Sequence, residues 1–353
     1  MAARDRSTLW TRNRLVVVAF LAALAFPFIV ALISGQSPGD VFSGETGNAK
    51  FLQGLIIEVF ILSLYALSYD LVLGVSGLLS FGHAMFFAVG AYGTGIMLKS
   101  FGWPLWLTFI AITVVGILQA FLFGMVLPRV KGISFALVTL GLASVFWIVV
   151  QSPDLGEYTG ADVGLQGVPI PDWIDTNVHR FRMYVLALVV LTAAYLIYRA
   201  LLKSPTGAVL LANRENEQRA LALGYNTFRF QLLALVVASL TAAYAGTLWT
   251  MQQPIVTPQV AGLGWTVAAL LMILIGGMGT LTGAIVGAAV YRLLAYYLEK
   301  WFGGLAAVLL GAAYIAIVLF LPYGIVGTWR AKAIERKAGY DRLKSLVTGR
   351  GGS

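Results

Sequence analysis

Four ionisable residues lie in stretches of the chain that are otherwise strongly apolar: Glu58, Asp70, His83 and Arg292. A charge inside a bilayer is costly, so such residues usually face a cavity or a partner and often mark a transport pathway. They form no paired-acid motif, no metal-binding spacing and no serine-nucleophile motif. The chain has no cysteine and two histidines, so a metal centre is not expected. An enzyme active site is therefore disfavoured, and a proton-coupled carrier would need a longer relay of ionisable groups.

Two glycine-interrupted segments are the other feature that could carry function. They read VSGLLSFGHAMFFAVGAY at 75–92 and IGGMGTLTGAIVGAAVY at 275–291. Broken helices in the two halves of a membrane protein often mark a translocation path, but small residues also permit close helix packing, and both interpretations stay open. His83 is interpreted as a polar pin that holds the first break. The translocation-path candidates are Gly77, Ser80, Gly82, His83, Gly277, Gly279, Thr280 and Gly283.

The composition identifies the solvent as a lipid bilayer. Hydrophobic residues make up 59% of the chain and charged residues 11%, whereas a soluble domain has about 25% charged residues. A spanning helix needs about 20 predominantly apolar residues. The sequence therefore predicts an all-α polytopic membrane protein with about ten transmembrane helices, some of them broken by glycine. The apolar runs are 15–33, 51–73, 84–98, 105–127, 133–150, 183–201, 228–251, 265–279, 283–298 and 305–322.

The basic residues indicate how these helices are oriented. If the N-terminus is cytoplasmic and the runs alternate, 18 Lys and Arg fall in inside segments and five in outside segments. Cytoplasmic loops carry the excess of Lys and Arg, so both termini are predicted to be cytoplasmic. The first run is longer than a signal-peptide core and is expected to be a retained span. The net charge of +9 thus reflects topology, and no nucleic-acid partner is expected.

The predicted organisation follows from this orientation. A basic cytoplasmic N-terminus at 1–14 precedes a transmembrane domain at 15–322, and a basic cytoplasmic tail follows at 323–353. Within the transmembrane domain, 151–182 is predicted to be an extracytoplasmic loop and 203–227 a cytoplasmic one.

The cytoplasmic segment 203–227, KSPTGAVLLANRENEQRALALGYNT, contains a short helical pattern. Asn213 is expected to cap a helix of about ten residues. Glu215 and Glu217 would lie in its first turns, where the helix dipole favours acids, and Gly224 can supply a left-handed end. A polar face beside an apolar patch is typical of a docking element, although a helix resting on lipid headgroups would look similar.

Four stretches carry a resemblance to a known family: SYDLVLGVSGLLSFGHAMFFAVGAY (68–92), TGADVGLQGV (159–168), SPTGAVLLANRENEQRALALGYN (204–226) and GGMGTLTGAIVGA (276–288). In type, order and spacing they resemble the LivM-type permease subunits of branched-chain amino acid ABC importers. The resemblance extends over most of the chain, while the first 50 residues and the tail carry little of it.

The resemblance implies a transport subunit that is not an enzyme and binds no cofactor of its own. Such a permease pairs with a second homologous permease in the inner membrane of a prokaryote. Two cytoplasmic ATPases, which bind ATP and Mg, and an extracytoplasmic substrate-binding protein complete the importer. Glu217, Ala220 and Gly224 match the Glu…Ala…Gly pattern of the segment that couples such permeases to an ATPase. The ATPase-coupling candidates are Asn213, Arg214, Glu215, Glu217, Ala220 and Gly224.

The predicted function is to form half of a translocation pathway for branched-chain or other apolar amino acids. The chain contains no P-loop, so ATP hydrolysis is assigned to the partners. Related subunits serve urea and short amides, and the motifs do not discriminate between these substrates. A stand-alone ion-coupled carrier or channel, which would use the four ionisable residues of the apolar runs, is the alternative from a different class.

Overall fold

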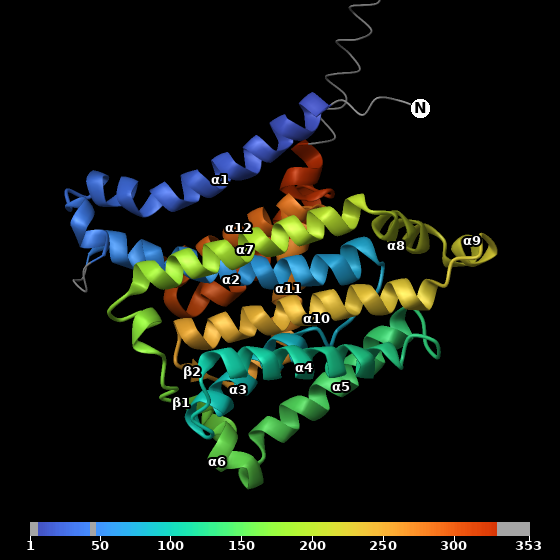
Figure 1. Cartoon of the computed structure of the whole chain (residues 1–353), viewed down its shortest axis with the longest axis horizontal. Helices are drawn as coiled ribbons and strands as arrows, with labels where there is room; N and C mark the ends of the chain where they lie inside the picture. Colours follow the sequence, from blue (N-terminus) through green and yellow to red (C-terminus); the bar gives the residue numbers. More distant parts are fainter. Residues whose placement is uncertain (1–5, 43–46, 330–353) are drawn as a thin grey trace, which may run out of the picture.

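The computed structural model describes residues 6–42 and 47–329, which form a helical bundle (Figure 1). Each of the ten predicted apolar runs is a helix. In chain order these are α1 (Arg6–Ile33), α2 (Asn48–Tyr69), α3 (Ala84–Lys99), α4 (Leu105–Gly124), α5 (Ile133–Gln151), α7 (Arg180–Lys203), α10 (Thr227–Gln252), α11 (Leu263–Gly276), α12 (Leu281–Phe302) and α13 (Ala306–Phe320). The first helix begins within the predicted N-terminal segment, and residues 1–5 and most of the predicted tail, 330–353, lie outside the described residues.

Helix α2 forms the centre of the bundle, with 89% of its apolar segment buried. It packs against α7, α10, α11 and α12, and Figure 1 shows it running alongside α7 and α10. Helix α3 packs against α10 so closely that a Cβ at Gly90 would lie 1.9 Å from the carbonyl oxygen of Ala243. Small residues at such crossings let membrane helices gain close van der Waals contact, which drives their association in lipid.

The outer helices expose large apolar side chains. Trp106 on α4, Ile148 on α5 and Val308 on α13 are 65%, 61% and 71% exposed, as expected for a surface that contacts lipid. By length and composition, seven segments of the described residues could cross a membrane, and the shorter helices α3 and α11 are also apolar. The chain is therefore an all-α, multi-pass membrane protein. The count of ten spans and the cytoplasmic location of both termini stay predictions.

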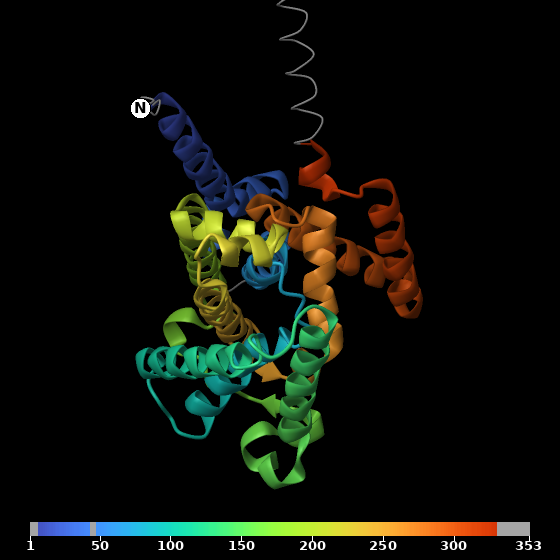
Figure 2. The same cartoon turned by 90° about the vertical axis from the view of Figure 1, so that its right-hand side faces the viewer.

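The loop predicted to be extracytoplasmic, 151–182, is folded. It contains α6 (Gly156–Thr159) and β1 (Leu165–Gln166), and β1 pairs antiparallel with β2 (Ile255–Val256), which follows α10. Figure 1 places this strand pair at the opposite end of the bundle from α8 (Pro205–Glu215) and α9 (Glu217–Ala222). In Figure 2, where the α8–α9 end faces the viewer, both short helices (yellow) lie on the near side. The two loops that the sequence assigns to opposite sides of the membrane thus lie at opposite ends of the helices.

Candidate functional site

The first glycine-interrupted segment is held by hydrogen bonds inside the core. Helix α2 continues as a π-helix over Asp70–Val75, and the chain is then non-helical until α3 begins at Ala84. The hydroxyl of Tyr69 donates to the carbonyl of Ser80 at 3.0 Å. The backbone N–H of Ala84 donates to Thr266 Oγ1 on α11 at 2.9 Å. The break expected at this position is therefore present, with Ser80 held by α2 and the start of α3 held by α11.

His83 lies fully buried at the end of this break. Its Nε2 is 2.8 Å from the hydroxyl oxygen of Ser68 on α2. The Ser68 hydroxyl also lies 2.6 Å from the carbonyl of Tyr65; with its hydrogen directed to that carbonyl, Ser68 accepts from a protonated Nε2. The rings of Tyr69 and Phe86 lie beside the imidazole, with centroids 4.8 and 5.3 Å away. These contacts fit the interpretation of His83 as a polar pin. Its hydrogen-bond partner, Ser68, was not among the candidate residues.

The second break separates α11 from α12 and is formed by backbone turns. Gly279 has a φ of +77°, a conformation that a residue with a Cβ rarely adopts. The hydroxyl of Thr280 donates to the carbonyl of Gly277 at 2.6 Å. A Cβ at Gly276 would lie 1.8 Å from the carbonyl oxygen of Gly283. Close packing of α11 on α12 therefore accounts for Gly283, while a role of these glycines in a translocation path stays a prediction.

The two breaks meet at one buried carboxylate. The backbone N–H of Gly279 donates to Asp70 Oδ1 at 2.7 Å, across 209 positions of sequence. Gly74 lies over the same contact, since a Cβ there would be 2.1 Å from Asp70 Oδ1 and 2.6 Å from the nitrogen of Gly279. We call Asp70, Gly74 and Gly279 the junction. Segments from the two halves of the chain thus form one structural unit at the C-terminal end of α2.

The predicted coupling segment forms two short helices, α8 and α9, each with its own cap. The side chains of Ser204, Asn216 and Asn226 accept hydrogen bonds from backbone N–H groups in the first turns of α8, α9 and α10. Gly224, with a φ of +85°, supplies the expected left-handed residue after α9.

The prediction that Asn213 caps the coupling helix was wrong. Asn213 lies inside α8, Glu215 is the last residue of α8, and α9 comprises six residues that begin at Glu217. The physical reason is that Ser204, followed by proline at the first helical position, is a strong helix start that already includes Asn213 in α8. Asn216 then breaks the helix and caps the next one.

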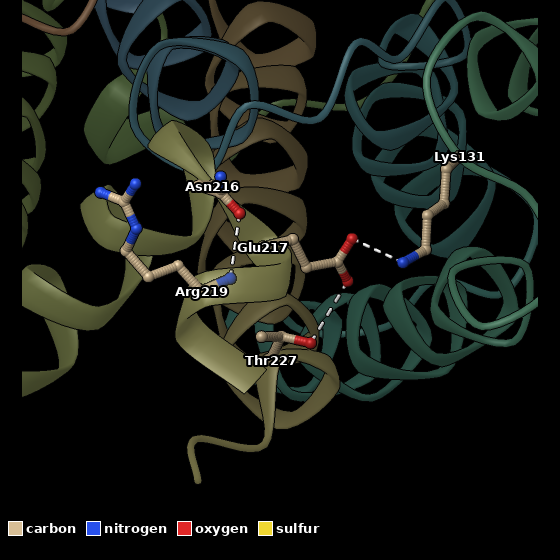
Figure 3. Close-up of polar contacts among 5 residues, drawn as sticks. All are labelled: Lys131, Asn216, Glu217, Arg219 and Thr227. Carbon is tan, nitrogen blue, oxygen red and sulfur yellow. Dashed lines mark hydrogen bonds and ion pairs between the residues drawn. The ribbon is translucent and has the colours of Figure 1, made fainter. Parts of the chain in front are cut away.

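Glu217 binds α9 to the rest of the bundle (Figure 3). Its carboxylate pairs with Lys131, in the α4–α5 loop, at 2.6 Å, and accepts a hydrogen bond from the hydroxyl of Thr227, at the start of α10, at 3.3 Å. Figure 3 shows the side chain of Arg219 pointing away from this cluster. Ala220, also in α9, is buried. The predicted coupling residues Glu217 and Ala220 therefore hold the helix in place, and other side chains of α9 face outward.

A cavity of about 130 Å³ lies between α8, the first break and the α4–α5 loop, and its lining includes Gly77, Lys131, Asn213 and Arg214. Asn213 is buried, and neither its amide nitrogen nor its amide oxygen has a hydrogen-bond partner among the described residues. The next residue of α8, Arg214, donates from its guanidinium to the carbonyl of Gly74. The predicted coupling segment therefore touches the junction directly.

Glu58 and Arg292 form an ion pair that joins α2 to α12. The side-chain amide of Gln253 donates to Glu58 at 3.1 Å. Asp70 and His83 make the separate contacts described above. The four ionisable residues of the apolar runs thus take part in three separate polar contacts and form no continuous relay such as a proton-coupled carrier would need.

The comparisons with a family model and with individual known proteins agree with one another. The family described as "Branched-chain amino acid transport system / permease component" matches residues 51–321. The chain is 26% identical to the high-affinity branched-chain amino acid transport system permease protein LivM of Salmonella typhimurium, over 96% of this chain and 80% of the relative. It is 26% identical to LivM of Escherichia coli K12, over 92% of this chain and 77% of the relative.

A second type of relative also matches. The probable branched-chain amino acid transport permease protein LivH of Methanocaldococcus jannaschii is 25% identical, over 81% of this chain and 95% of the relative. No solved structure matches the chain. Because the family match covers α2 to α13, including both glycine breaks and the α8–α9 segment, the chain belongs to the family of branched-chain amino acid transport system permease components.

Proposed function

We propose that the chain is a permease subunit of an ATP-binding-cassette importer and forms half of its pathway for branched-chain or other apolar amino acids. The names of the LivM and LivH relatives support this substrate class. Since the chain matches both types, two homologous permeases of this kind would pair to form the pathway. A substrate-binding protein outside and two ATPases inside, which bind ATP and Mg, would complete the importer in the inner membrane of a prokaryote.

The observation that carries the proposal is the exposed apolar surface of α9 and of the turn that follows it. Leu221, Leu223 and Tyr225 are 43%, 71% and 45% exposed at the end of the bundle. We call these three residues the docking surface. An apolar patch on a short helix that extends beyond a bundle suits the groove of a protein partner, and the partner proposed here is the ATPase.

The contacts of α9 explain how such a surface stays in one orientation. Asn216 caps the helix, and Glu217 binds it to Lys131 and Thr227. A surface that is ordered before binding loses less conformational entropy when the partner docks. Glu217 is therefore assigned to positioning α9, while the leucines and the tyrosine make the contact.

The test is co-purification of the ATPases with chains that carry aspartate in the docking surface. Leu221→Asp with Leu223→Asp should abolish co-purification, because two charges would be buried in an apolar contact. The matched control is Val163→Asp, which changes a 67% exposed apolar residue in the loop at the opposite end of the bundle. Both variants should insert into the membrane normally, and retention of the ATPases by the double variant would refute the docking surface.

Transport by the purified chain separates this function from the carrier alternative. Leucine uptake into proteoliposomes should require ATP and the partner subunits. Uptake by the chain alone, driven by an ion gradient, would overturn the proposal. Competition by valine and isoleucine, but not by urea or acetamide, should distinguish amino acids from short amides.

A further inference from the structure

Arg214, in the last turn of α8, contacts both glycine breaks. Its guanidinium donates to the carbonyl of Gly74 in the π-helix. A Cβ at Gly77, in the first break, would lie 3.0 Å from Arg214 Cγ, and a Cβ at Gly279, in the second, would lie 3.2 Å from Arg214 Nη1. The side chain therefore crosses the first break and ends against the second.

The carbonyl of Gly74 is available to Arg214 because the helix ends there. The last carbonyls of a helix have no partner within it. In the turn that follows, backbone N–H groups satisfy the preceding carbonyls, those of Leu71, Val72 and Leu73. The carbonyl of Gly74 receives the guanidinium, which is also favoured as a cation at the negative end of the helix dipole.

Arg214 lies close to Asp70 without forming an ion pair with it: its guanidinium binds the carbonyl of Gly74, and a Cβ at Gly74 would lie 2.1 Å from Asp70 Oδ1. Asp70 Oδ2 is buried and has no hydrogen-bond partner among the described residues, whereas Oδ1 accepts from Gly279. A buried carboxylate with one free oxygen depends on a nearby positive charge. Removal of Arg214 would therefore weaken the whole junction and not only the contact with Gly74.

The surroundings of Arg214 leave room for it to move. Its side chain borders the cavity of about 130 Å³ beneath α8, whereas most of a protein interior is too densely packed to rearrange continuously. Arg214 is two residues before Asn216, the cap of α9. A displacement of α9 thus reaches Arg214 through a very short length of backbone.

We propose that Arg214 transmits movement of α9 to the junction, so that displacement of the docking surface by the ATPase changes the contact between Asp70, Gly74 and Gly279. The inference rests on the proposed function, because the ATPase is the source of the movement. Arg214 is a positioning residue in this scheme, since it acts on the breaks through Gly74 and Asp70. The transmitted change brings the two glycine breaks together or separates them at the inner end of the bundle.

The first test needs only the isolated chain. Because the chain has no cysteine, single cysteines at Leu223 and Met278, both exposed, can carry spin labels that report the distance between α9 and the second break. The chain with Arg214 should give one narrow distance distribution, and Arg214→Ala should broaden it. Arg214→Lys, which keeps the charge, should restore it in part.

The matched control is Arg129→Ala. Arg129 is an exposed arginine in the turn after α4, and it donates to the carbonyl of Met125 in the same turn at 2.6 Å. Its loss therefore removes the same kind of bond without breaking a link between distant segments. Its distance distribution should be unchanged. An Arg214→Ala distribution as narrow as that of the control would overturn the inference.

The second test measures leucine transported per ATP hydrolysed by the assembled importer. Arg214→Ala should lower this ratio about tenfold, as expected for loss of one charge-assisted hydrogen bond that differs between two states. The ATPases should still co-purify, because the docking surface is intact. An unchanged ratio would overturn the inference, and so would loss of the ATPases, which would make Arg214 part of the docking contact.

A second variant alters the junction itself and leaves Arg214 unchanged. Gly74→Ala should lower the same ratio, because its Cβ would displace Asp70 from Gly279, whereas Gly141→Ala, where nothing lies within 4 Å of the added Cβ, should not. Failure of the proposed function would be seen separately, as an unsubstituted chain that binds no ATPase. The distance measurement on the isolated chain would then still decide whether Arg214 joins α9 to the breaks.

Discussion

The two glycine breaks differ in what holds them. The first, between α2 and α3, is fixed by three buried side chains, two from α2 and one from α11: Tyr69 binds Ser80, Ser68 binds His83, and Thr266 binds the start of α3. The second, between α11 and α12, has a side-chain and a backbone hydrogen bond from Thr280 to the carbonyl of Gly277 within its own turn, and its one buried side-chain partner from another helix, among the described residues, is Asp70. Ser80 and His83 are fully buried, whereas Met278, in the middle of the second break, is 39% exposed.

This difference indicates how the two breaks would share a movement. A segment that is held by many buried contacts has a high local stability, and one that is held by few opens more easily. The first break therefore acts as a fixed joint, and the second is the one that yields when Arg214 moves. Both are glycine-rich in sequence, so the difference lies in their surroundings and not in their composition.

The largest effect is expected from Gly82→Ala in the first break. The added Cβ would lie 2.1 Å from the backbone carbonyl oxygen of Thr139 on α5, and backbone in a packed crossing cannot give way. The free energy of unfolding in mild detergent should fall by about 3 kcal/mol, at the upper end for overpacking. The control Gly141→Ala, on the same helix as Thr139 and in open space, should be neutral or stabilising by about 0.5–1 kcal/mol. Equal effects of the two substitutions would show that the first break is not rigid.

A smaller effect on stability is expected from Gly279→Ala in the second break. The positive φ costs about 1–2 kcal/mol for a residue with a Cβ. The nearest atoms, the Gly74 carbonyl oxygen at 3.1 Å and Arg214 Nη1 at 3.2 Å, include the end of a flexible side chain that can shift. Thermal unfolding should therefore change modestly while ATP-driven leucine uptake falls strongly.

The control for this substitution is Gly264→Ala on α11, where nothing lies within 4 Å. Uptake by the control should be normal. If Gly279→Ala were as destabilising as Gly82→Ala, the second break would be as rigid as the first, and the proposed division between them would be wrong.

The helices and the positions of both breaks could be predicted from the sequence, because apolar length and glycine content are local properties. The start of the coupling helix could be predicted only in part. Asn213 and Asn216 are both good capping residues, and the choice depended on Ser204 and Pro205, which begin α8 several residues earlier. The left-handed stop at Gly224 was predicted correctly, since glycine strongly favours that conformation.

The contacts that join the breaks could not be predicted. Asp70 was noted as a costly charge, but its partner is a backbone N–H 209 positions away, and a backbone group leaves no signal in residue type. Arg214 reaches Gly74 across 140 positions for the same reason. The link between His83 and Ser68 spans only 15 positions, yet serine is too common in membrane helices to be singled out.

His83→Leu tests how much of the rigidity of the first break comes from its polar pin. The substitution removes one hydrogen bond, to Ser68, and keeps an apolar body among the neighbouring rings, so about 1 kcal/mol of stability should be lost. His83→Gln, whose amide can again donate to Ser68, should recover part of it. Transport rate should fall with stability while the preference among leucine, valine and isoleucine stays the same. A changed preference with normal stability would place His83 in the pathway instead.

The smallest effect is expected from Asp70→Asn, which separates the two roles of this carboxylate. An asparagine Oδ1 can still accept from the N–H of Gly279, but the negative charge opposite Arg214 is lost. Because charge-assisted hydrogen bonds are roughly twice as strong as neutral ones, stability should change by less than about 1 kcal/mol while the contact loosens. Asp70→Leu removes the acceptor as well and leaves a buried N–H unsatisfied, which costs about 1–3 kcal/mol. If the two variants unfold at the same temperature, the charge opposite Arg214 holds the second break; if only the leucine variant is destabilised, the acceptor does, and the second break is tied to α2 by geometry more than by charge.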